Sequence, residues 1–125
     1  MATILLVDDD PLVLNFCARV LQGIEGLEVL KADGSGQAIR VASEYPGPIP
    51  LLLSDISMPG AMTGLELAQN LTAFRPDMKV VLMSGQVRES ADFKPGWQFL
   101  KKPFLPGTLV AAVANAGALG TSVHR

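Results

Sequence analysis

Short apolar runs alternate with amphipathic segments along the chain. The apolar runs predict five β-strands, at 3–7, 27–32, 50–54, 79–83 and 97–101. The first, third and fourth runs are almost wholly apolar, which is typical of parallel strands buried on both faces. Because helical segments separate the strands, we expect an α/β domain with a parallel sheet, helices on both faces and right-handed crossovers.

The segments between the strands carry helical patterns. Apolar positions recur at helical spacing in the first segment, which ends at Gly23, and they are Val13, Phe16, Cys17, Val20 and Leu21. Further helices are predicted at 35–45, at 63–74, where Thr63 and Glu66 have capping-box spacing, and at 106–119. The segment 85–96 contains Pro95 and Gly96 and is short, so its helix is predicted to have one or two turns or to be absent.

Size and composition narrow the class of protein. The chain has 125 residues, 49% of them hydrophobic and 18% charged, which predicts one folded domain over 1–120 and a short tail at 121–125. The net charge of −2 and the scattered Lys and Arg residues give no basic stripe, so direct nucleic-acid binding is not expected. A single cysteine, no secretory leader and no membrane-spanning stretch predict a cytoplasmic protein without a membrane partner.

Three consecutive carboxylates follow the first strand, and like charges about 5 Å apart repel by roughly 3 kcal/mol per pair at an effective dielectric of about 20. They are Asp8, Asp9 and Asp10. Asp10 precedes a proline and is predicted to cap the first helix. Ligands of an open parallel sheet bind beyond the carboxyl ends of its strands, where other polar residues also follow, namely Asp55, Ser84, Lys101 and Lys102. Clustered carboxylates suit a hard divalent cation such as Mg²⁺, which would offset the repulsion.

Four segments together resemble the signature blocks of the response-regulator (CheY-like) receiver domain of bacterial two-component signalling. They read ILLVDDDP, LLLSDISMPGAMTGLEL, VVLMSG and FLKKPF, occur in the family's order and cover nearly the whole chain. The resemblance implies a flavodoxin-like, doubly wound, five-stranded sheet with strand order 2-1-3-4-5. The MPGAMTG loop has one residue more than the commoner family pattern.

The resemblance also implies roles for individual residues. Asp55 would accept a phosphoryl group from a phosphohistidine of a sensor histidine kinase or a phosphotransfer protein. Mg²⁺ would be held by Asp8, Asp9, Asp55 and the backbone carbonyl of Ser57, with Asp9 a direct ligand and Asp8 one that could act through water. Lys102 would pair with the phosphoryl oxygens, its peptide bond to Pro103 would be cis, and the neighbouring Lys101 is expected to be solvated.

A conformational switch is expected to follow phosphorylation. The Ser84 hydroxyl would move toward the phosphoryl oxygens, and the aromatic Phe99 would turn inward into the vacated space. Phe99 could equally be an ordinary core residue. Ser57 and Gln86 would tune the lifetime of the phosphoryl group, in a direction that the sequence does not give.

The output would pass to an unidentified protein partner. The segment from Pro103 to Val123 has no charged residue, so its helix could present an apolar surface to a partner or form a homodimer. His124, in the tail, is a poor candidate for a phosphorelay, so the phosphodonor is expected on another chain or on a further part of this one.

Three alternatives differ in class. The chain could be a free-standing switch, or a receiver module from a hybrid histidine kinase or a larger response regulator. It could also be a small aspartyl-phosphate hydrolase, since Asp8 and Asp10 imitate an Asp-x-Asp motif, although a receiver is expected only to phosphorylate and dephosphorylate itself. A flavodoxin would share the fold, but three carboxylates after the first strand oppose binding of a flavin phosphate there.

Overall fold

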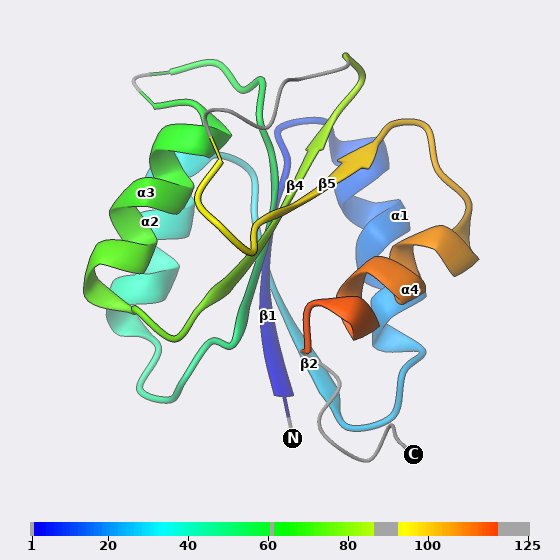
Figure 1. Cartoon of the computed structure of the whole chain (residues 1–125), viewed down its shortest axis with the longest axis horizontal. Coiled ribbons are helices and arrows are strands. Elements are labelled where there is room, and N and C mark those ends of the chain that lie inside the picture. The colour runs from blue at the N-terminus through cyan, green and yellow to red at the C-terminus, as the bar shows by residue number, and fades with distance from the viewer. Residues whose placement is uncertain (1, 61, 87–92, 118–125) are drawn as a thin grey trace.

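The computed structural model describes residues 2–60, 62–86 and 93–117 (Figure 1). Five parallel strands form one sheet in the order β2-β1-β3-β4-β5. Their bounds are β1 (Ala2–Val7), β2 (Leu27–Ala32), β3 (Leu51–Asp55), β4 (Lys79–Ser84) and β5 (Gln98–Lys101). The predicted strand order is therefore confirmed, and each strand lies within one residue of the range predicted from its apolar run.

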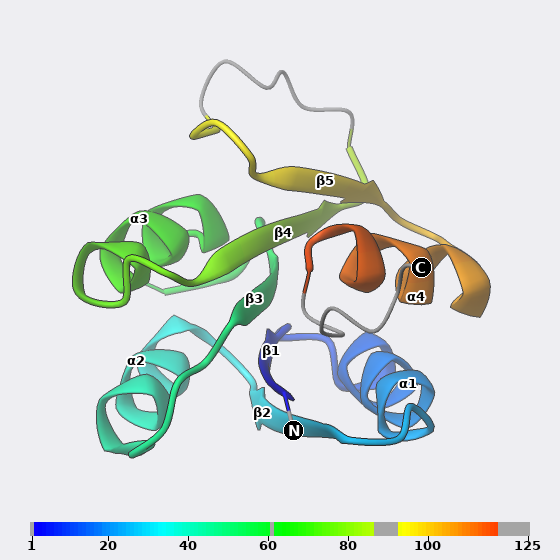
Figure 2. The ribbon, with the colours of Figure 1, turned by 60° about the horizontal axis from the view of Figure 1, so that its bottom comes forward.

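Two pairs of helices cover the sheet. Figure 2 shows α1 (Pro11–Gln22) and α4 (Pro106–Asn115) on one face, and α2 (Ser35–Glu44) and α3 (Gly64–Phe74) on the other. Successive residues of a strand point to opposite faces, so each central strand contributes to two hydrophobic clusters. In β1, Leu5 and Val7 pack under α2 and α3, whereas Ile4 and Leu6 pack under α1 and α4. This double burial explains why β1, β3 and β4 are almost wholly apolar.

The helix ends agree with the predicted caps. The Asp10 carboxylate accepts a hydrogen bond of 2.9 Å from the Leu12 N–H, and Gly23 caps the other end of α1. Thr63 and Glu66 form the predicted capping box at the start of α3. These bonds satisfy backbone donors that have no partner within the helix.

The predicted first helix is confirmed, but one residue of its apolar stripe, Phe16, is not buried. The side chain of Phe16 is 39% exposed, and the helix instead buries Cys17, Ala18 and Leu21. Phe16 lies beside the buried face of α1, and the centroid of its ring is 6.2 Å from that of Phe104. Cys17 is the core residue that the sequence predicts, and burial raises the pKa of its thiol to about 11.

Two predictions fall partly outside the described residues. In the segment 85–96, for which a short or absent helix is predicted, residues 85, 86 and 93–96 form no helix. Residues 87–92 are not among those that the structure describes. The last helix ends at Asn115, before Gly117 at φ +83°, and residues 118–125, including the predicted tail and His124, are likewise not among them. Within the described ranges no helix is both long enough and apolar enough to cross a membrane.

An arginine joins the ends of two helices. The guanidinium of Arg75, at the C-cap of α3, donates to three backbone carbonyls in and after α2, those of Ala42 (2.8 Å), Tyr45 (3.0 Å) and Gly47 (2.9 Å). A guanidinium has five N–H donors in one plane, so it can donate to several carbonyls at once. Arg75 therefore fixes the chain between α2 and β3 relative to α3.

Candidate functional site

The carboxyl ends of the two central strands bring three carboxylates together. Asp8 and Asp9 follow β1, Asp55 ends β3, and one oxygen from each lies within 4.8 Å of the others. Asp8 is fully buried and Asp55 is 6% exposed, whereas Asp9 is open to solvent. The sheet order explains this arrangement, because β1 and β3 are neighbours and end at the same edge.

Lys102 connects two of these carboxylates. Its ammonium Nζ lies 2.8 Å from Asp8 Oδ2 and 3.1 Å from Asp55 Oδ1. The Lys102 backbone N–H donates to the carbonyl of Ser84 at 2.8 Å, which holds this residue at the end of β4. The Lys102–Pro103 peptide bond is cis, as the resemblance implies, and Lys101 is exposed as expected. Lys102 is thus the one predicted lysine that reaches the site.

Burial and charge act in opposite directions on these groups. Burial raises the pKa of Asp55, the hydrogen bond from Lys102 counteracts this, and the nearby Asp8 raises the pKa further. For Lys102, burial lowers the pKa, but the hydrogen bonds to Asp8 and Asp55 outweigh burial and leave the pKa raised. The ammonium therefore stays charged at neutral pH, and an additional cation would favour the carboxylate form of Asp55.

The three carboxylates fit a hard divalent cation but are not equally available. Asp8 is engaged through both oxygens, since Oδ1 accepts from the Asp10 N–H at 2.9 Å and Oδ2 pairs with Lys102. Asp9 is exposed, and no hydrogen bond to its side chain forms within the described parts of the chain. Oxygen ligands at this separation suit Mg²⁺, with Asp9 and Asp55 the more accessible ligands. Ser57 is exposed two residues after Asp55, and the role of its carbonyl stays a prediction.

Magnesium is expected to stabilise the folded protein through Asp9. At a concentration ten times its Kd, Mg²⁺ should add about 1.4 kcal/mol to the free energy of unfolding, because it binds only the folded site. Asp9→Asn should remove most of this gain, whereas Asp77→Asn, which changes an exposed carboxylate before the amino end of β4, at the opposite edge of the sheet, should retain it. Urea unfolding with and without MgCl₂ measures both. Equal gains in the two variants would contradict an Asp9 site.

The two predicted switch residues occupy neighbouring strands. Ser84 is 2% exposed at the end of β4, and its hydroxyl accepts from the Gln86 N–H at 3.1 Å. Phe99 is half-buried on β5, with its ring 6.3 Å from that of Phe93, which in turn lies 6.4 Å from Trp97. Phe99 thus belongs to a row of three aromatic rings, and its switching role stays a prediction.

Two features of the site escaped the sequence analysis. Gly64, at the start of α3, packs so closely on β3 that a Cβ would overlap the carbonyl oxygen of Asp55 and lie 2.8 Å from its carbonyl carbon. Beside Lys102, exposed or half-buried apolar side chains form a surface that we call the α1 apolar surface, made of Leu12, Val13, Phe16 and Phe104. The residues of both features can be read from the sequence, but their positions in space depend on the path of the loops that connect strands and helices.

Comparisons with known proteins agree with this geometry. The model of the response regulator receiver domain family matches residues 4–114. The chain is 35% identical over 109 residues to the sensor kinase CckA of Brucella abortus and 38% identical over 85 residues to the response regulator GacA of Pseudomonas aeruginosa. These matches include 82% and 67% of this chain but 11% and 38% of those relatives, so the chain spans only a part of each. The receiver protein CpdR of Brucella abortus is 33% identical, over 83% of this chain and 87% of its own.

Solved structures show the same fold. The receiver domain of the hybrid histidine kinase CckA superposes with a TM-score of 0.79 at 33% identity, covering 92% of this chain and 98% of that one. The response regulator TrrA of Thermotoga maritima, solved in complex with Mg²⁺-BeF, superposes with a TM-score of 0.80 at 28% identity, covering 93% and 99%. The whole described fold is therefore shared with these proteins.

Proposed function

The chain belongs to the response regulator receiver domain family of two-component systems, and from this membership we propose that Asp55 accepts a phosphoryl group from a phosphohistidine of a partner protein. The observation that carries the proposal is the contact of Lys102 with Asp8 and Asp55 beside the exposed Asp9. A nucleophilic carboxylate, a fixed cation and a metal-binding pair are the parts that phosphoryl transfer to aspartate requires.

In the proposed reaction a carboxylate oxygen of Asp55 attacks the phosphorus of the phosphohistidine. An O–P bond forms, the P–N bond breaks, and the released imidazole takes up a proton. Lys102, whose ammonium is 3.1 Å from Asp55 Oδ1, would pair with the oxygens of the transferred group. Mg²⁺, held by Asp9 and Asp55 with Asp8 nearby, would supply further positive charge to those oxygens.

The charges of the site explain why the reaction would need a cation. Three ionised carboxylates and one ammonium give −3 + 1 = −2, which repels an anionic phosphodonor. One divalent cation brings the sum to zero, −2 + 2 = 0. The TrrA structure contains Mg²⁺ together with BeF, which supports the same requirement in a relative. We therefore infer that phosphorylation depends on Mg²⁺.

The α1 apolar surface is the place where the phosphodonor protein would dock. Receiver domains interact with kinases and with downstream effectors. Leu12 and Phe16 are 79% and 39% exposed, and a cavity of about 220 Å³ between α1 and Phe104 extends to Lys102. Exposed apolar side chains of this size beside a reactive group favour a protein partner over a small donor. The partner would be a sensor kinase or a phosphotransfer protein.

Output would follow from movement of Ser84 and Phe99 and would reach a protein partner. The homodimer through α4 stays a prediction. The large side chains Leu109 and Val113 of that helix are buried against the sheet and α1, so they do not contribute to its exposed surface. The same phosphoryl chemistry is expected whether the receiver stands alone, as its match to most of CpdR favours, or belongs to a longer chain, as its match to CckA favours.

Intact mass measurement with acetyl phosphate tests the proposal. We expect one phosphoryl adduct that requires Mg²⁺ and is absent in Asp55→Asn, while Asp77→Asn, which changes an exposed carboxylate just before β4, at the opposite edge of the sheet, is labelled like the unmodified protein. An adduct in Asp55→Asn would contradict the assignment, as would the lack of any adduct when a control receiver is labelled. Multiple turnovers of an aryl phosphate would instead favour the hydrolase alternative.

A further inference from the structure

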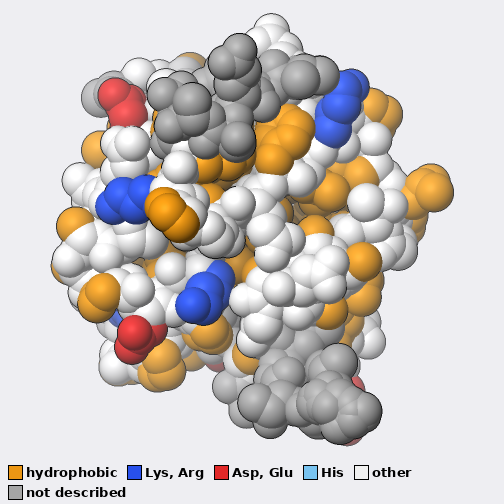
Figure 3. All heavy atoms as spheres, viewed as in Figure 1, with side chains coloured by type: hydrophobic (Ala, Val, Ile, Leu, Met, Phe, Trp, Pro, Cys, Tyr) orange, Lys and Arg blue, Asp and Glu red, His pale blue; other side chains and the backbone are white. Residues whose placement is uncertain are grey.

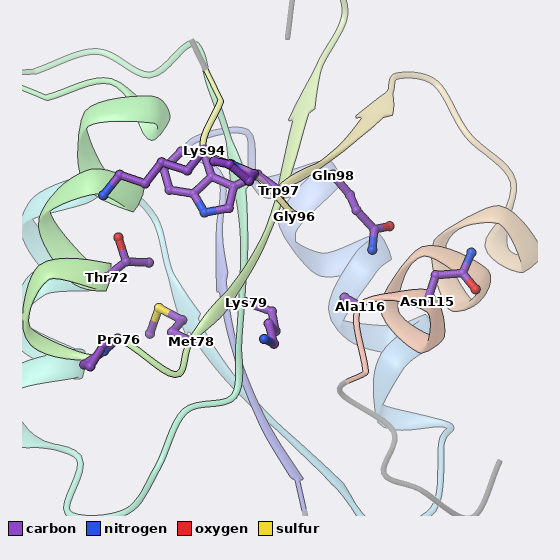
Figure 4. Close-up of a pocket in the computed structure, with 11 residues that line it drawn as sticks. Thr72, Pro76, Met78, Lys79, Lys94, Gly96, Trp97, Gln98, Asn115 and Ala116 are labelled. Carbon is purple, nitrogen blue, oxygen red and sulfur yellow. The ribbon is translucent and has the colours of Figure 1, made fainter. Parts of the chain in front are cut away.

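A second pocket lies far from Asp55, at the amino ends of β4 and β5. It has a volume of about 510 Å³ and opens between the C-terminal ends of α3 and α4 (Figure 4). This size falls in the range of roughly 300 to 1,000 Å³ that is typical of ligand sites. Asp55 pairs with Met83 near the end of β4, whereas the pocket includes Lys79, the first residue of that strand, so the two sites occupy opposite edges of the sheet.

The pocket carries positive charge in a protein of net charge −2. Lys79 and Lys94 line it, and among the residues that the structure describes no Asp or Glu does. Among the residues described, neither ammonium lies within 4.0 Å of a carboxylate, since both ion pairs found there belong to Lys102. Figure 3 shows separate blue Lys and Arg side chains on this face, with red Asp or Glu side chains toward its margin. The pocket therefore suits an anionic ligand.

Other hydrogen-bond donors surround the same space. In Figure 4 the indole nitrogen of Trp97 lies on the side of the ring toward Thr72 and Met78, and the amides of Gln98 and Asn115 approach from the α4 side. The faces of the indole are partly covered, because Lys94 Nζ is 5.9 Å from the ring centroid and the Phe93 ring is 6.4 Å away. The ring thus offers its N–H edge more readily than a face on which a nucleobase could stack.

The lysines are not needed to cap the neighbouring helices. The C-terminal end of a helix attracts cations through its free carbonyls. At the end of α3 the Leu71 carbonyl already accepts from the Arg75 N–H, and at the end of α4 the carbonyls of Ala112 and Ala114 accept from Ala116 and Gly117. The helix ends therefore do not require the charge of either lysine, and the Lys94 ammonium lies over the Trp97 ring without a carboxylate partner among the described residues.

We propose that this pocket binds an acidic peptide segment of a partner protein. Two Asp or Glu side chains of the segment pair with Lys79 and Lys94, and its main-chain carbonyls accept hydrogen bonds from the Trp97 indole and the Gln98 and Asn115 amides. A peptide fits better than a nucleic acid, because the described lining of the pocket has two ammonium groups, no arginine and no open aromatic face. The inference does not depend on phosphorylation of Asp55.

Binding of a defined peptide to the whole, unphosphorylated chain tests the proposal. The probe is a blocked peptide of alternating Asp and Gly, compared with one in which Asn replaces Asp, and binding is followed by calorimetry and by emission of Trp97, the only tryptophan. The Asp peptide should bind more tightly than the Asn peptide, and less tightly as salt rises. Replacing both lysines, Lys79→Gln with Lys94→Gln, should weaken binding about tenfold. Lys31→Gln, an exposed lysine on β2, should change it by less than about twofold.

Any of four outcomes would overturn the proposal. The first is equal binding of the Asp and Asn peptides, and the second is equal weakening by Lys31→Gln and by the double substitution. The third is tighter binding of a single-stranded oligothymidylate than of the Asp peptide, which would assign the pocket to nucleic acid. Urea unfolding of each variant checks that the fold persists, and a double variant that is less stable but binds the peptide normally would show that the lysines serve the fold alone.

Discussion

Replacing Gly64 by alanine is expected to lower the free energy of unfolding by about 3 kcal/mol or more and to prevent phosphorylation of Asp55. The new Cβ would overlap the Asp55 carbonyl oxygen and lie 2.9 Å from Ile56 Cα, so the backbone at the end of β3 or at the start of α3 must move. The Gly64 N–H donates to the Ile56 carbonyl at 2.8 Å, which ties the two segments together. Any movement therefore displaces the phosphoacceptor.

Gly36→Ala is the matched control for this effect. Gly36 lies in the first turns of α2, and a Cβ there would meet no atom within 4 Å. Alanine favours the helix by up to about 1 kcal/mol relative to glycine, so stability should stay constant or rise slightly. Urea unfolding and acetyl phosphate labelling of both variants measure the difference. A Gly64→Ala protein that is as stable and as readily labelled as Gly36→Ala would refute the close packing.

Lys102→Met should destabilise the fold by about 3 kcal/mol at neutral pH and abolish stable phosphorylation. The substitution removes the only ammonium within 4.0 Å of Asp8 and Asp55 in the described parts of the chain, and it leaves a fully buried and an almost buried carboxylate uncompensated. Methionine has a similar length and keeps the apolar contacts of the side-chain stem. The loss therefore reports on charge.

The stability difference between the unmodified protein and Lys102→Met should depend on pH. The raised pKa of Asp55 means that its charged form opposes folding, and this penalty disappears as the pH falls through that pKa. Without Lys102 the pKa of Asp55 rises further, so the difference is largest near neutral pH and narrows in acid. It should also narrow as the pH rises through the raised pKa of Lys102, above which the ammonium no longer contributes.

Lys101→Met provides the control, because Lys101 is exposed on the adjacent position of β5. It should change stability by less than about 0.5 kcal/mol at any pH and leave labelling intact. Denaturant unfolding from pH 4 to pH 11 compares the variants. If Lys102→Met lost no more stability than Lys101→Met at neutral pH, the ion pairs would contribute nothing to the fold.

The elements of this fold are readable from the sequence for identifiable physical reasons. The runs at β1, β3 and β4 are almost wholly apolar because helices cover both faces of those strands. Asp10 and Thr63 are residue types typical of helix N-caps, and they predict where α1 and α3 begin. The strand order could not be predicted in this way, because hydrophobic periodicity indicates where strands lie in the sequence but not which strands are neighbours in the sheet. It came from the resemblance to receiver domains, which also pointed to Asp55 and Lys102.

Features that depend on distances across the fold could not be predicted in this way. The sequence shows a glycine at 64 but not that α3 begins against the Asp55 carbonyl. It shows Phe16 on an apolar stripe but not that the stripe turns away from the sheet there, toward Phe104. The pocket beside Trp97 combines residues of four elements, so no local pattern reveals it.

The contacts of Arg75 have a consequence for how this sequence can diverge. Within the described parts of the chain the guanidinium binds only main-chain oxygens, those of Ala42, Tyr45 and Gly47, and every residue type supplies such an oxygen. Exposed residues between them, Ser43, Glu44 and Pro46, contribute no side chain to these bonds. The exposed residues of the turn after α2 can therefore be substituted during evolution without changing the backbone path of the turn, as long as Arg75 is retained.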